Sequence, residues 1–317
     1  MIEVKKSSPN NEVAPISKNK YESMNKLYIF MTGLPSRLKR RIQDKVQNNI
    51  YPTILAGKVT ITFPWRPLAK PHGLAAPLII SLTSYPARFG KLPLTLKCLL
   101  SQSIKADRVI LWIAHEDKSE LTPAILDLQK IGLEIAYCDN FRSFKKIIPT
   151  LQLFPNSFIA TADDDLYYWS TWLAEMVQGY KNNSREVKLV VCHRAHQIQL
   201  GGNKLPLPYA QWETETQRLE ASPLVFQTGV GGVLYPPGIF HRDVLEIEVF
   251  NKLCPNGDDI WLYWMMRLNG GIACKVGVRR MLYTWPDTQH TALFHNNTVG
   301  GGNDIQISAM IKNYNFP

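Results

Sequence analysis

The sequence lacks the features that would assign it to a membrane-spanning or secreted class. Its best apolar candidate, residues 27–34, is far shorter than the ~20 residues that a membrane-spanning helix needs. The N-terminal residues 1–10 do not contain the apolar core of a signal peptide. We therefore expect a cytoplasmic protein without a helical membrane anchor.

Cysteine is scarce, and its spacing argues against two kinds of structural support. The five cysteines are odd in number and none forms a C-x-x-C pair, so we expect neither a disulfide framework nor a zinc site. Most of them lie within apolar runs, where a thiol packs as a small hydrophobic group. A reducing compartment fits this pattern.

Acidic residues are outnumbered, since 36 Lys and Arg oppose 26 Asp and Glu and give a net charge of +10. A basic balance favours nucleic acid, an anionic membrane or an anionic small substrate as partner, or a cationic surface without a specific partner. Zinc-finger spacing, RNA-recognition signatures and basic-leucine heptads are missing, so we do not expect nucleic-acid binding. With 317 residues, 45% of them hydrophobic, the chain can form a large buried core.

An N-terminal extension precedes the organised part of the chain. Residues 1–20 are polar and predict a loose tail, and residues 28–31 and 35–41 add an apolar patch and a cluster of cations. This element is either a helix packed on the main domain or a peripheral contact with an anionic membrane, such as the inner face of the plasma membrane. A Pro-rich linker follows. We assign the extension and linker to residues 1–75 and the main domain to residues 76–317.

The main domain alternates apolar strand patterns with helical patterns. Such alternation is typical of βαβ units, and continuous apolar runs suit strands that are buried on both faces of a parallel sheet. We therefore predict an α/β fold with a doubly wound, mainly parallel, Rossmann-like sheet that binds ligands at the carboxyl ends of its strands. The predicted strands are 78–83, 108–113, 133–137, 157–162 and 187–192, and the predicted helices are 94–100, 120–131, 145–153 and 260–268.

Three consecutive carboxylates, Asp163-Asp164-Asp165, directly follow the fourth predicted strand. Their mutual repulsion destabilises this place unless a cation or hydrogen bonds compensate it. Hard divalent ions such as Mg²⁺ and Mn²⁺ bind carboxylate and phosphate oxygens, so one ion could bridge the protein to a diphosphate. The alternative is an acidic turn that caps a helix beginning near Trp169.

An apolar strand that runs into D-x-D resembles the nucleotide-sugar-dependent glycosyltransferases of the GT-A fold, close to the family-2-like bacterial enzymes. The resemblance covers about residues 78–305. It implies that Asp163 lies near the ribose and reaches the metal, that Asp165 coordinates the metal, and that Asp164 lies beside the donor. The implied cofactor is Mn²⁺ or Mg²⁺.

The segment after the first strand and a later basic pair carry further parts of the resemblance. Thr83 and Tyr85 stand where the family contacts the base or ribose, and Arg88 is either near the nucleotide or in a structural salt bridge. Lys146, the second residue of Lys145-Lys146, is implied to approach the donor diphosphate, a task that suits a compact point charge. A solvated pair at a helix start is the alternative.

Two later segments resemble the acceptor half of the family. In the glycine-rich run 227–235, Gly231 and Gly232 are implied to let the backbone approach the sugar, although a tightly packed strand also explains them. Asp258-Asp259 precede a predicted helix and resemble the paired acids that supply the base in inverting enzymes. Asp259 is implied to take the proton of the acceptor hydroxyl and Asp258 to orient it. Capping of the helix N-terminus is the alternative.

The C-terminal region adds a possible metal ligand and a loop. Because a late histidine completes the metal shell in many such enzymes, the resemblance implies His295, with His290 behind it. Residues 300–304 are glycine-rich and predict a flexible loop over the donor. His193 and His196 either line the acceptor cleft or are purely structural.

The predicted function is that of a metal-dependent glycosyltransferase. The expected donor is a nucleotide-sugar, with UDP implied by the resemblance, bound by residues 76–180. The expected acceptor is a bacterial surface glycan or its lipid-linked precursor, bound by residues 181–317, and inversion depends on Asp259 acting as the base. The alternatives are a metal-dependent nucleotidyltransferase or phosphodiesterase, and a non-catalytic glycan-binding protein.

Overall fold

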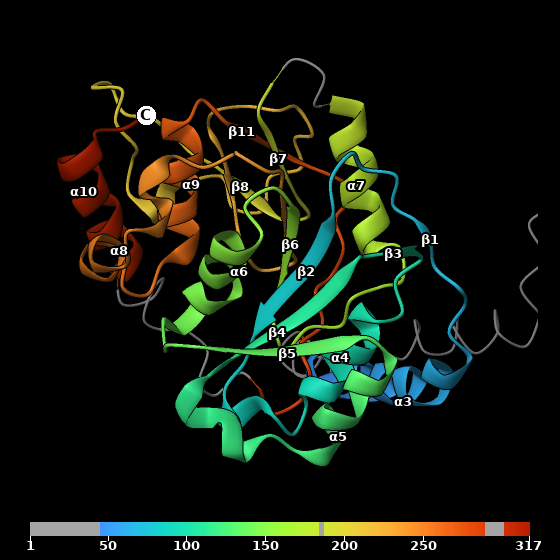
Figure 1. The fold of residues 1–317 in the computed structure, drawn as a ribbon. Coiled ribbons are helices and arrows are strands. Elements are labelled where there is room, and N and C mark those ends of the chain that lie inside the picture. The colour runs from blue at the N-terminus through green and yellow to red at the C-terminus, as the bar shows by residue number, and fades with distance from the viewer. Residues whose placement is uncertain (1–44, 184–186, 289–300) are drawn as a thin grey trace, which may run out of the picture. The chain divides into compact units, whose positions relative to one another are not determined.

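The structure is a computed structural model that describes residues 45–183, 187–288 and 301–317 (Figure 1). The chain divides into two compact units, residues 1–50 and 51–317, and only the second is described at length. In the first unit, Val46–Ile50 form a turn of π-helix. The predicted N-terminal tail, apolar patch and basic cluster lie outside the described residues.

A seven-stranded sheet forms the centre of the second unit, with the order β11-β7-β10-β6-β2-β4-β5. All neighbouring pairs are parallel except those of β10, which runs antiparallel to both β6 and β7. The predicted α/β fold with a mainly parallel, Rossmann-like sheet is therefore confirmed. The strands are β2 (Leu78–Thr83), β4 (Arg108–Ala114), β5 (Leu133–Cys138), β6 (Phe158–Ala162), β7 (Leu189–Cys192), β10 (Val233–Tyr235) and β11 (Ile272–Lys275).

The helices agree with the predicted pattern in place but not always in type. Two small sheets accompany them: β1 (Lys70–Pro71) with β3 (Ile104–Lys105), and β8 (Ala195–Gln197) with β9 (Val225–Gln227). None of the described helices is both long and apolar enough to cross a membrane. The helices are α3 (Tyr51–Thr62), α4 (Leu92–Leu99), α5 (Pro123–Leu126), α6 (Ile148–Leu153), α7 (Trp172–Asn183), α8 (Ile247–Leu253), α9 (Asp258–Leu268) and α10 (Gly302–Tyr314).

Two predicted helices contain 3-10 turns. The helix expected over 120–131 is the four-residue α5 followed by a 3-10 turn, Asp127–Ile131, which ends at Gly132 with φ 107°. The helix expected over 145–153 begins as a 3-10 turn, Arg142–Lys146, before α6. Proline occupies the first turn of both α5 and α6, and since it has no amide hydrogen it is better suited to starting a helix than to continuing one.

Two clusters of buried side chains hold the sheet between layers of helices. The first lies where α3, α4 and α7 pack, and it includes Leu78, Ile80 and Leu82 from alternate positions of β2. The second surrounds α9, whose residues Ile260 to Met266 are all buried. Because Leu55 and Val59 of α3 belong to the first cluster, α3 is part of the sheet-bearing unit and not of the extension assigned to residues 1–75.

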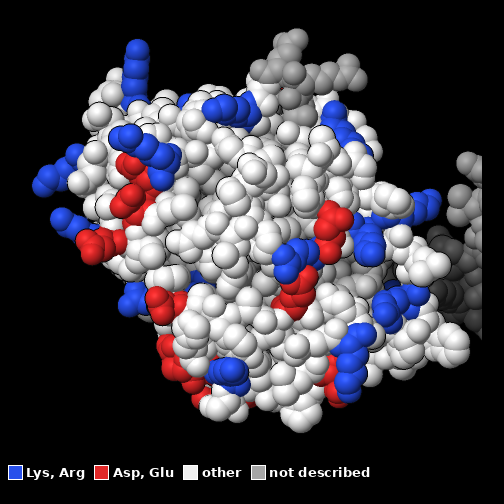
Figure 2. Space-filling model, in the orientation of Figure 1, with Lys and Arg blue, Asp and Glu red and all other residues white. Residues whose placement is uncertain are grey.

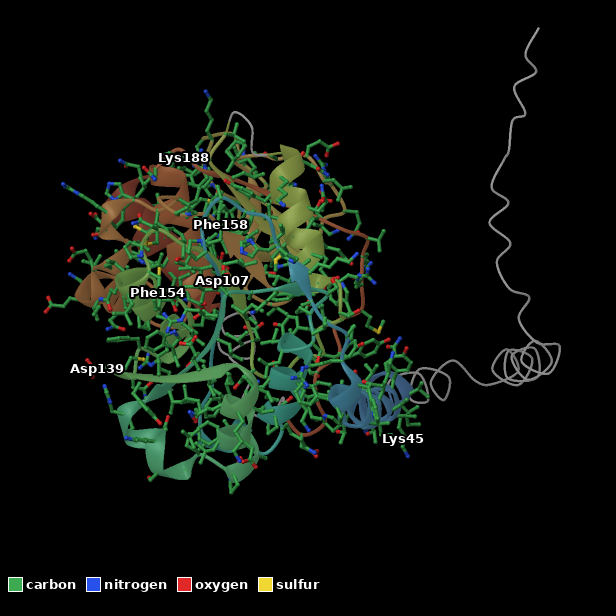
Figure 3. The ribbon with its side chains drawn as sticks, turned by 45° about the vertical axis from the view of Figure 1, so that its right-hand side comes forward. Lys45, Asp107, Asp139, Phe154, Phe158 and Lys188 are labelled. Atoms are coloured by element: carbon green, nitrogen blue, oxygen red, sulfur yellow. The ribbon has the colours of Figure 1, made fainter. Side chains whose placement is uncertain are left out.

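The polarity of the sheet decides which edge can bind a ligand. In Figure 3, the labelled Asp107 and Phe158 lie at the amino ends of β4 and β6, and Asp139 directly follows the carboxyl end of β5. The aspartate triplet, residues 163–165, follows the carboxyl end of β6. It therefore lies at the edge where Rossmann-like sheets bind ligands.

Candidate active site

A cavity of about 640 Å³ opens at the carboxyl ends of β2 and β6. Both predicted halves of the main domain line it, since the segments after β2 and β6 meet residues from the loop after β9 and from the start of α9. The predicted site residues among its lining are Thr83, Tyr85, Arg88, Lys146, Asp163, Asp164, Asp165, Asp258 and Asp259. Tertiary structure thus brings together four segments of the sequence, residues 83–88, 146, 163–165 and 258–259.

The backbone of the aspartate triplet is fixed by three buried residues. The amide of Asp163 donates to the Tyr168 hydroxyl at 2.8 Å, and the Thr95 hydroxyl donates to the second carbonyl of the triplet at 3.0 Å. The Trp285 amide donates to the third carbonyl at 2.8 Å, and the Trp285 indole donates to Thr95 at 2.7 Å. These bonds orient the three carboxylates, because the loop that carries them has little freedom to turn.

Arg88 compensates two of the three carboxylates. Its guanidinium lies 3.0 Å from Asp164 and also contacts Asp165. The Ser84 hydroxyl donates to Asp164 at 2.5 Å. Burial raises the pKa of Asp164 to about 6 although Arg88 opposes that shift. Of the two predicted roles for Arg88, the structure shows the salt bridge, and the same side chain faces the cavity.

Thr83 at the end of β2 and Tyr85 just after it position the cavity wall and the Arg88 guanidinium. The Thr83 hydroxyl donates to the Trp112 carbonyl at 2.8 Å, which holds the end of β2 against β4. Arg88 donates through Nε to the Tyr85 hydroxyl at 3.3 Å. Both Thr83 and Tyr85 line the cavity, as expected for residues that contact a base or ribose.

Lys146 lies between the two acidic motifs. Its buried ammonium is 2.9 Å from Asp258 and 3.3 Å from Asp163. Burial would lower its pKa, but the neighbouring carboxylates raise that pKa well above the ordinary value, so the lysine stays charged. Lys146 therefore joins the triplet to the start of α9, a role that the sequence did not reveal.

Lys145 has a different environment in the same cavity. It is 3% exposed, and its ammonium donates to the Ser84 carbonyl at 3.5 Å. Burial lowers its pKa, with weaker opposing effects from nearby acids. The resemblance singles out Lys146 of this pair for the donor diphosphate, with a solvated pair at a helix start as the alternative. Both lysines are buried and line the cavity, and Lys146 is in addition held by two carboxylates.

Asp259 stands at the first turn of α9, next to a glycine that sequence reasoning passed over. The Gly229 amide donates to Asp259 Oδ1 at 2.9 Å. A Cβ atom on Gly229 would lie 2.7 Å from that oxygen and 3.0 Å from Lys146 Nζ, so a larger residue here would displace the carboxylate. Burial, followed by the charge of Asp258, raises the pKa of Asp259 to about 7. A carboxylate with such a pKa is well matched to accepting a proton near neutral pH.

The structure places Gly231 and Gly232 differently from the prediction. Neither lines the cavity, and both have positive φ angles, 93° and 97°. The Gly231 carbonyl accepts a hydrogen bond from the Trp172 indole at 2.7 Å. A Cβ atom on Gly232 would lie 2.5 Å from the same ring. The two glycines thus form a turn packed against α7, and Gly229 takes the predicted place beside the ligand cavity.

The histidine predictions fall into two groups. His290 and His295 lie outside the described residues. His193 and His196 are buried outside the cavity lining, where His193 Nε2 lies 2.9 Å from the Trp172 carbonyl and His196 Nδ1 accepts from the Glu215 amide at 2.9 Å. For these two, the structural alternative is the one observed.

The predicted glycine-rich loop over residues 300–304 is replaced, in its described part, by the start of α10. Helix α10 begins at Gly302, and Asn303 lines the cavity. Asp304 accepts from the Tyr209 amide at 2.7 Å. The short polar residues of this segment begin a helix because the residues after them pack Ile307 and Met310 against the α9 cluster.

The described residues provide carboxylate oxygens at the cavity, and these oxygens are already paired with Arg88 and Lys146. Among the described residues, no group of three or more His, Cys, Asp and Glu is arranged to hold a metal. Mg²⁺ is usually held by one or two carboxylates together with substrate phosphates, and not by a protein cage. Asp163 and Asp165, both facing the cavity, are hard oxygen donors of that kind.

Four strands of the sheet, β2, β4, β5 and β6, are each followed by a helix, and the reversed strand β10 lies between β6 and β7. It is a Rossmann-like α/β fold with one antiparallel strand. No protein-family model and no curated protein matches the sequence.

Three solved structures are similar at low identity. Residues 1–349 of S. aureus TarS share 12% identity at a TM-score of 0.41, and the match covers 66% of this chain and 60% of TarS 1–349. A CMP:2-keto-3-deoxy-manno-octonic acid synthetase complexed with CTP shares 8% identity at a TM-score of 0.36, and the match covers 63% of this chain and 88% of the synthetase. A UDP-glucose pyrophosphorylase complexed with UDP-glucose shares 12% identity at a TM-score of 0.36, and the match covers 76% of this chain and 99% of the pyrophosphorylase. The roles of individual residues therefore rest on the cavity itself.

Proposed function

We propose that this chain is a glycosyltransferase that moves a sugar from a nucleotide-sugar, a UDP-sugar by the sequence resemblance, to a hydroxyl of a glycan or lipid-linked glycan. One observation supports this most strongly. A single cavity is lined by cations and hydroxyls near the ends of β2 and β6 and also by Asp259, a carboxylate whose pKa is raised to about 7. Transfer from an anionic donor to a hydroxyl needs both.

The donor would lie over the strand ends. Thr83 and Tyr85 are placed for the nucleoside, and Lys145 with Arg88 would contact the diphosphate. A lysine ammonium provides a point charge and an arginine a forked donor, so the pair suits oxygens that gain charge as the sugar leaves. The burial that lowers the Lys145 pKa also strengthens its attraction for an anion.

We propose that Asp163 and Asp165 would hold Mn²⁺ or Mg²⁺ together with the diphosphate, with His295 as a further candidate. When bound, the ion supplies positive charge against the leaving diphosphate. Arg88 would then remain on Asp164, which its guanidinium already contacts at 3.0 Å.

Asp259 would act as the base. It takes the proton of the acceptor hydroxyl while the hydroxyl oxygen forms a bond to the anomeric carbon. The bond from that carbon to the diphosphate oxygen breaks, and the nucleoside diphosphate leaves with the electron pair. Attack from the face opposite the leaving group inverts the anomeric centre. The Gly229 amide orients the base, and Asp258 with Lys146 fixes the start of its helix.

The first test is calorimetric titration of UDP, GDP and CMP with and without Mn²⁺. We expect Mn²⁺-dependent binding of UDP to the wild type, lost in Asp165→Ala and kept in Asp127→Ala, a matched change at an exposed carboxylate paired with Lys130. Failure of every nucleotide to bind, with or without Mn²⁺, would sink the proposal.

A second measurement separates the enzymatic alternatives. With UDP-sugars and candidate acceptors, a glycosyltransferase releases UDP in step with glycoside formation. Release of pyrophosphate from a nucleoside triphosphate and a sugar phosphate would indicate nucleotidyl transfer. Cleavage of a phosphodiester substrate without transfer would indicate a phosphodiesterase, and glycan binding without any turnover would indicate a binding protein.

A further inference from the structure

The end of α3 and the turn after it expose large apolar side chains. Ile61 is 73% exposed, Trp65 is 85% exposed and Leu68 is 99% exposed. Leu55 and Val59 on the other side of α3 are buried in the core, so the exposed side chains project from an anchored element. Exposed single apolar residues are common, but a tryptophan and a leucine this exposed within four positions mark an interaction surface.

The chain segment that carries these side chains contains no acidic residue, and the acid that follows it, Asp107, is paired with His72. Between Tyr51 and Ala106 the sequence contains no Asp or Glu and seven Lys and Arg. Two of the cations flank Phe63, with the Arg66 guanidinium 4.8 Å and the Lys97 ammonium 5.7 Å from the ring centroid. In Figure 2, the right-hand edge, where β1 and α3 lie in Figure 1, carries Lys and Arg among uncharged surface. Apolar and cationic groups are therefore adjacent.

We propose that this surface docks on an anionic lipid bilayer. We name it the basic apolar surface and define it as Lys58, Ile61, Trp65, Arg66, Leu68, Lys70 and Lys97. Tryptophan and leucine partition into the boundary between headgroups and acyl chains, and lysine and arginine next to them attract anionic headgroups. No residue of the surface lines the cavity, so the proposal does not depend on the proposed function.

Charge decides between a bilayer and a second copy of the chain. A two-fold dimer through this surface would place it against itself, which brings cations against cations. An anionic bilayer provides the complementary charge together with an apolar layer for Trp65 and Leu68. The helix itself is too short to span such a layer, so the contact is peripheral.

The experiment is co-sedimentation of the full chain with vesicles of phosphatidylcholine alone and of phosphatidylcholine with 40% phosphatidylglycerol. We expect binding to the anionic vesicles that falls at high salt, and a decrease of about tenfold or more in the partition coefficient of Trp65→Ser/Leu68→Ser. The control is Leu153→Ser/Val278→Ser, which removes two exposed apolar side chains of 64% and 72% exposure elsewhere and should bind as the wild type does.

Two results would overturn the proposal. The first is binding of Trp65→Ser/Leu68→Ser equal to that of the wild type, which would assign any membrane contact to another part of the chain. The second is absence of vesicle binding together with concentration-dependent self-association of the wild type, measured by sedimentation velocity, that the same variant abolishes. That outcome would make the surface a contact between copies. Circular dichroism of the variants checks that they are folded, as expected for changes at exposed positions.

Discussion

The Lys146 ammonium lies 2.9 Å from the Asp258 carboxylate, and this pair connects the aspartate triplet after β6 to the start of α9. Because the lysine also contacts Asp163 at 3.3 Å, it compensates a carboxylate from each half of the main domain. Both side chains are buried. Removing one of them therefore leaves the charge of the other without compensation.

Replacing this lysine should destabilise the fold. For Lys146→Met we expect a loss of about 3–5 kcal/mol in the free energy of unfolding, because buried carboxylates lose their counter-charge. The measurement is urea denaturation followed by circular dichroism. Lys130→Met is the control, since that lysine is exposed on the surface. A variant as stable as the wild type would show that the buried carboxylates are neutral without Lys146.

Asp259→Asn should separate chemistry from binding. We expect kcat to fall by roughly 10²–10⁴-fold, because an amide cannot accept the proton, while the affinity for UDP stays unchanged. Release of UDP from the UDP-sugar in the presence of acceptor measures the first quantity, and calorimetry the second. The hypothesis of a base at this position fails if kcat changes by less than a factor of a few.

The pKa of Asp259 predicts the pH dependence of the reaction. Burial raises that pKa to about 7, so the carboxyl is protonated and inactive as a base at lower pH. We expect kcat/KM to rise with pH, to bend near pH 7 and then to level off. This rise of kcat/KM with pH should disappear in Asp259→Asn, because the variant has no carboxyl at this position to titrate. A limb that persists in that variant would assign the titration to another group.

The raised pKa of Asp259 also has a consequence for stability. A carboxyl whose pKa is higher in the folded state favours folding at low pH, and this contribution is lost as the pH rises through about 7. The side chain of Asp259→Asn does not ionise, so the variant avoids that loss. We therefore expect the stability of the variant minus that of the wild type to be more favourable to the variant at pH 8 than at pH 5. Thermal denaturation at the two pH values measures the difference, and an equal effect of the substitution at both would contradict the shift.

Lys145 should contribute to donor affinity. In Lys145→Met we expect UDP binding to weaken by roughly tenfold, because the anion loses a buried cation, while binding of uridine is unaffected. The comparison of UDP with uridine by calorimetry isolates the phosphate contact. Equal loss for both ligands would indicate a change in the shape of the cavity instead.

Gly229→Ala should displace the carboxylate of Asp259, the proposed base. The new Cβ atom would lie 2.7 Å from Asp259 Oδ1, so the carboxylate has to move and its orientation toward the acceptor is lost. We expect kcat to fall by about 10²-fold with donor affinity retained. Gly202→Ala, which adds a Cβ atom with nothing within 4 Å, provides the comparison. Unchanged turnover in Gly229→Ala would remove the amide from the proposed mechanism.

The sequence by itself determined the alternation of elements and the order of the acidic motifs. The apolar run predicted β2 over residues 78–83 with the observed bounds, because a strand buried on both faces is apolar at most of its positions. The placement of the triplet after β6 followed from the same pattern. The proline-started helices were predicted less well, since 3-10 and α-helical turns share their apolar spacing.

Only the tertiary structure decided which side chains meet. Adjacent lysines, 145 and 146, have the same chemistry, yet Lys146 is held between Asp163 and Asp258 and Lys145 donates to the Ser84 carbonyl. Likewise, Gly229 lies against Asp259, whereas Gly231 and Gly232 pack on Trp172. Sequence spacing cannot distinguish these cases, because the contacts arise when β10 is inserted antiparallel between β6 and β7 and α9 is buried beside them.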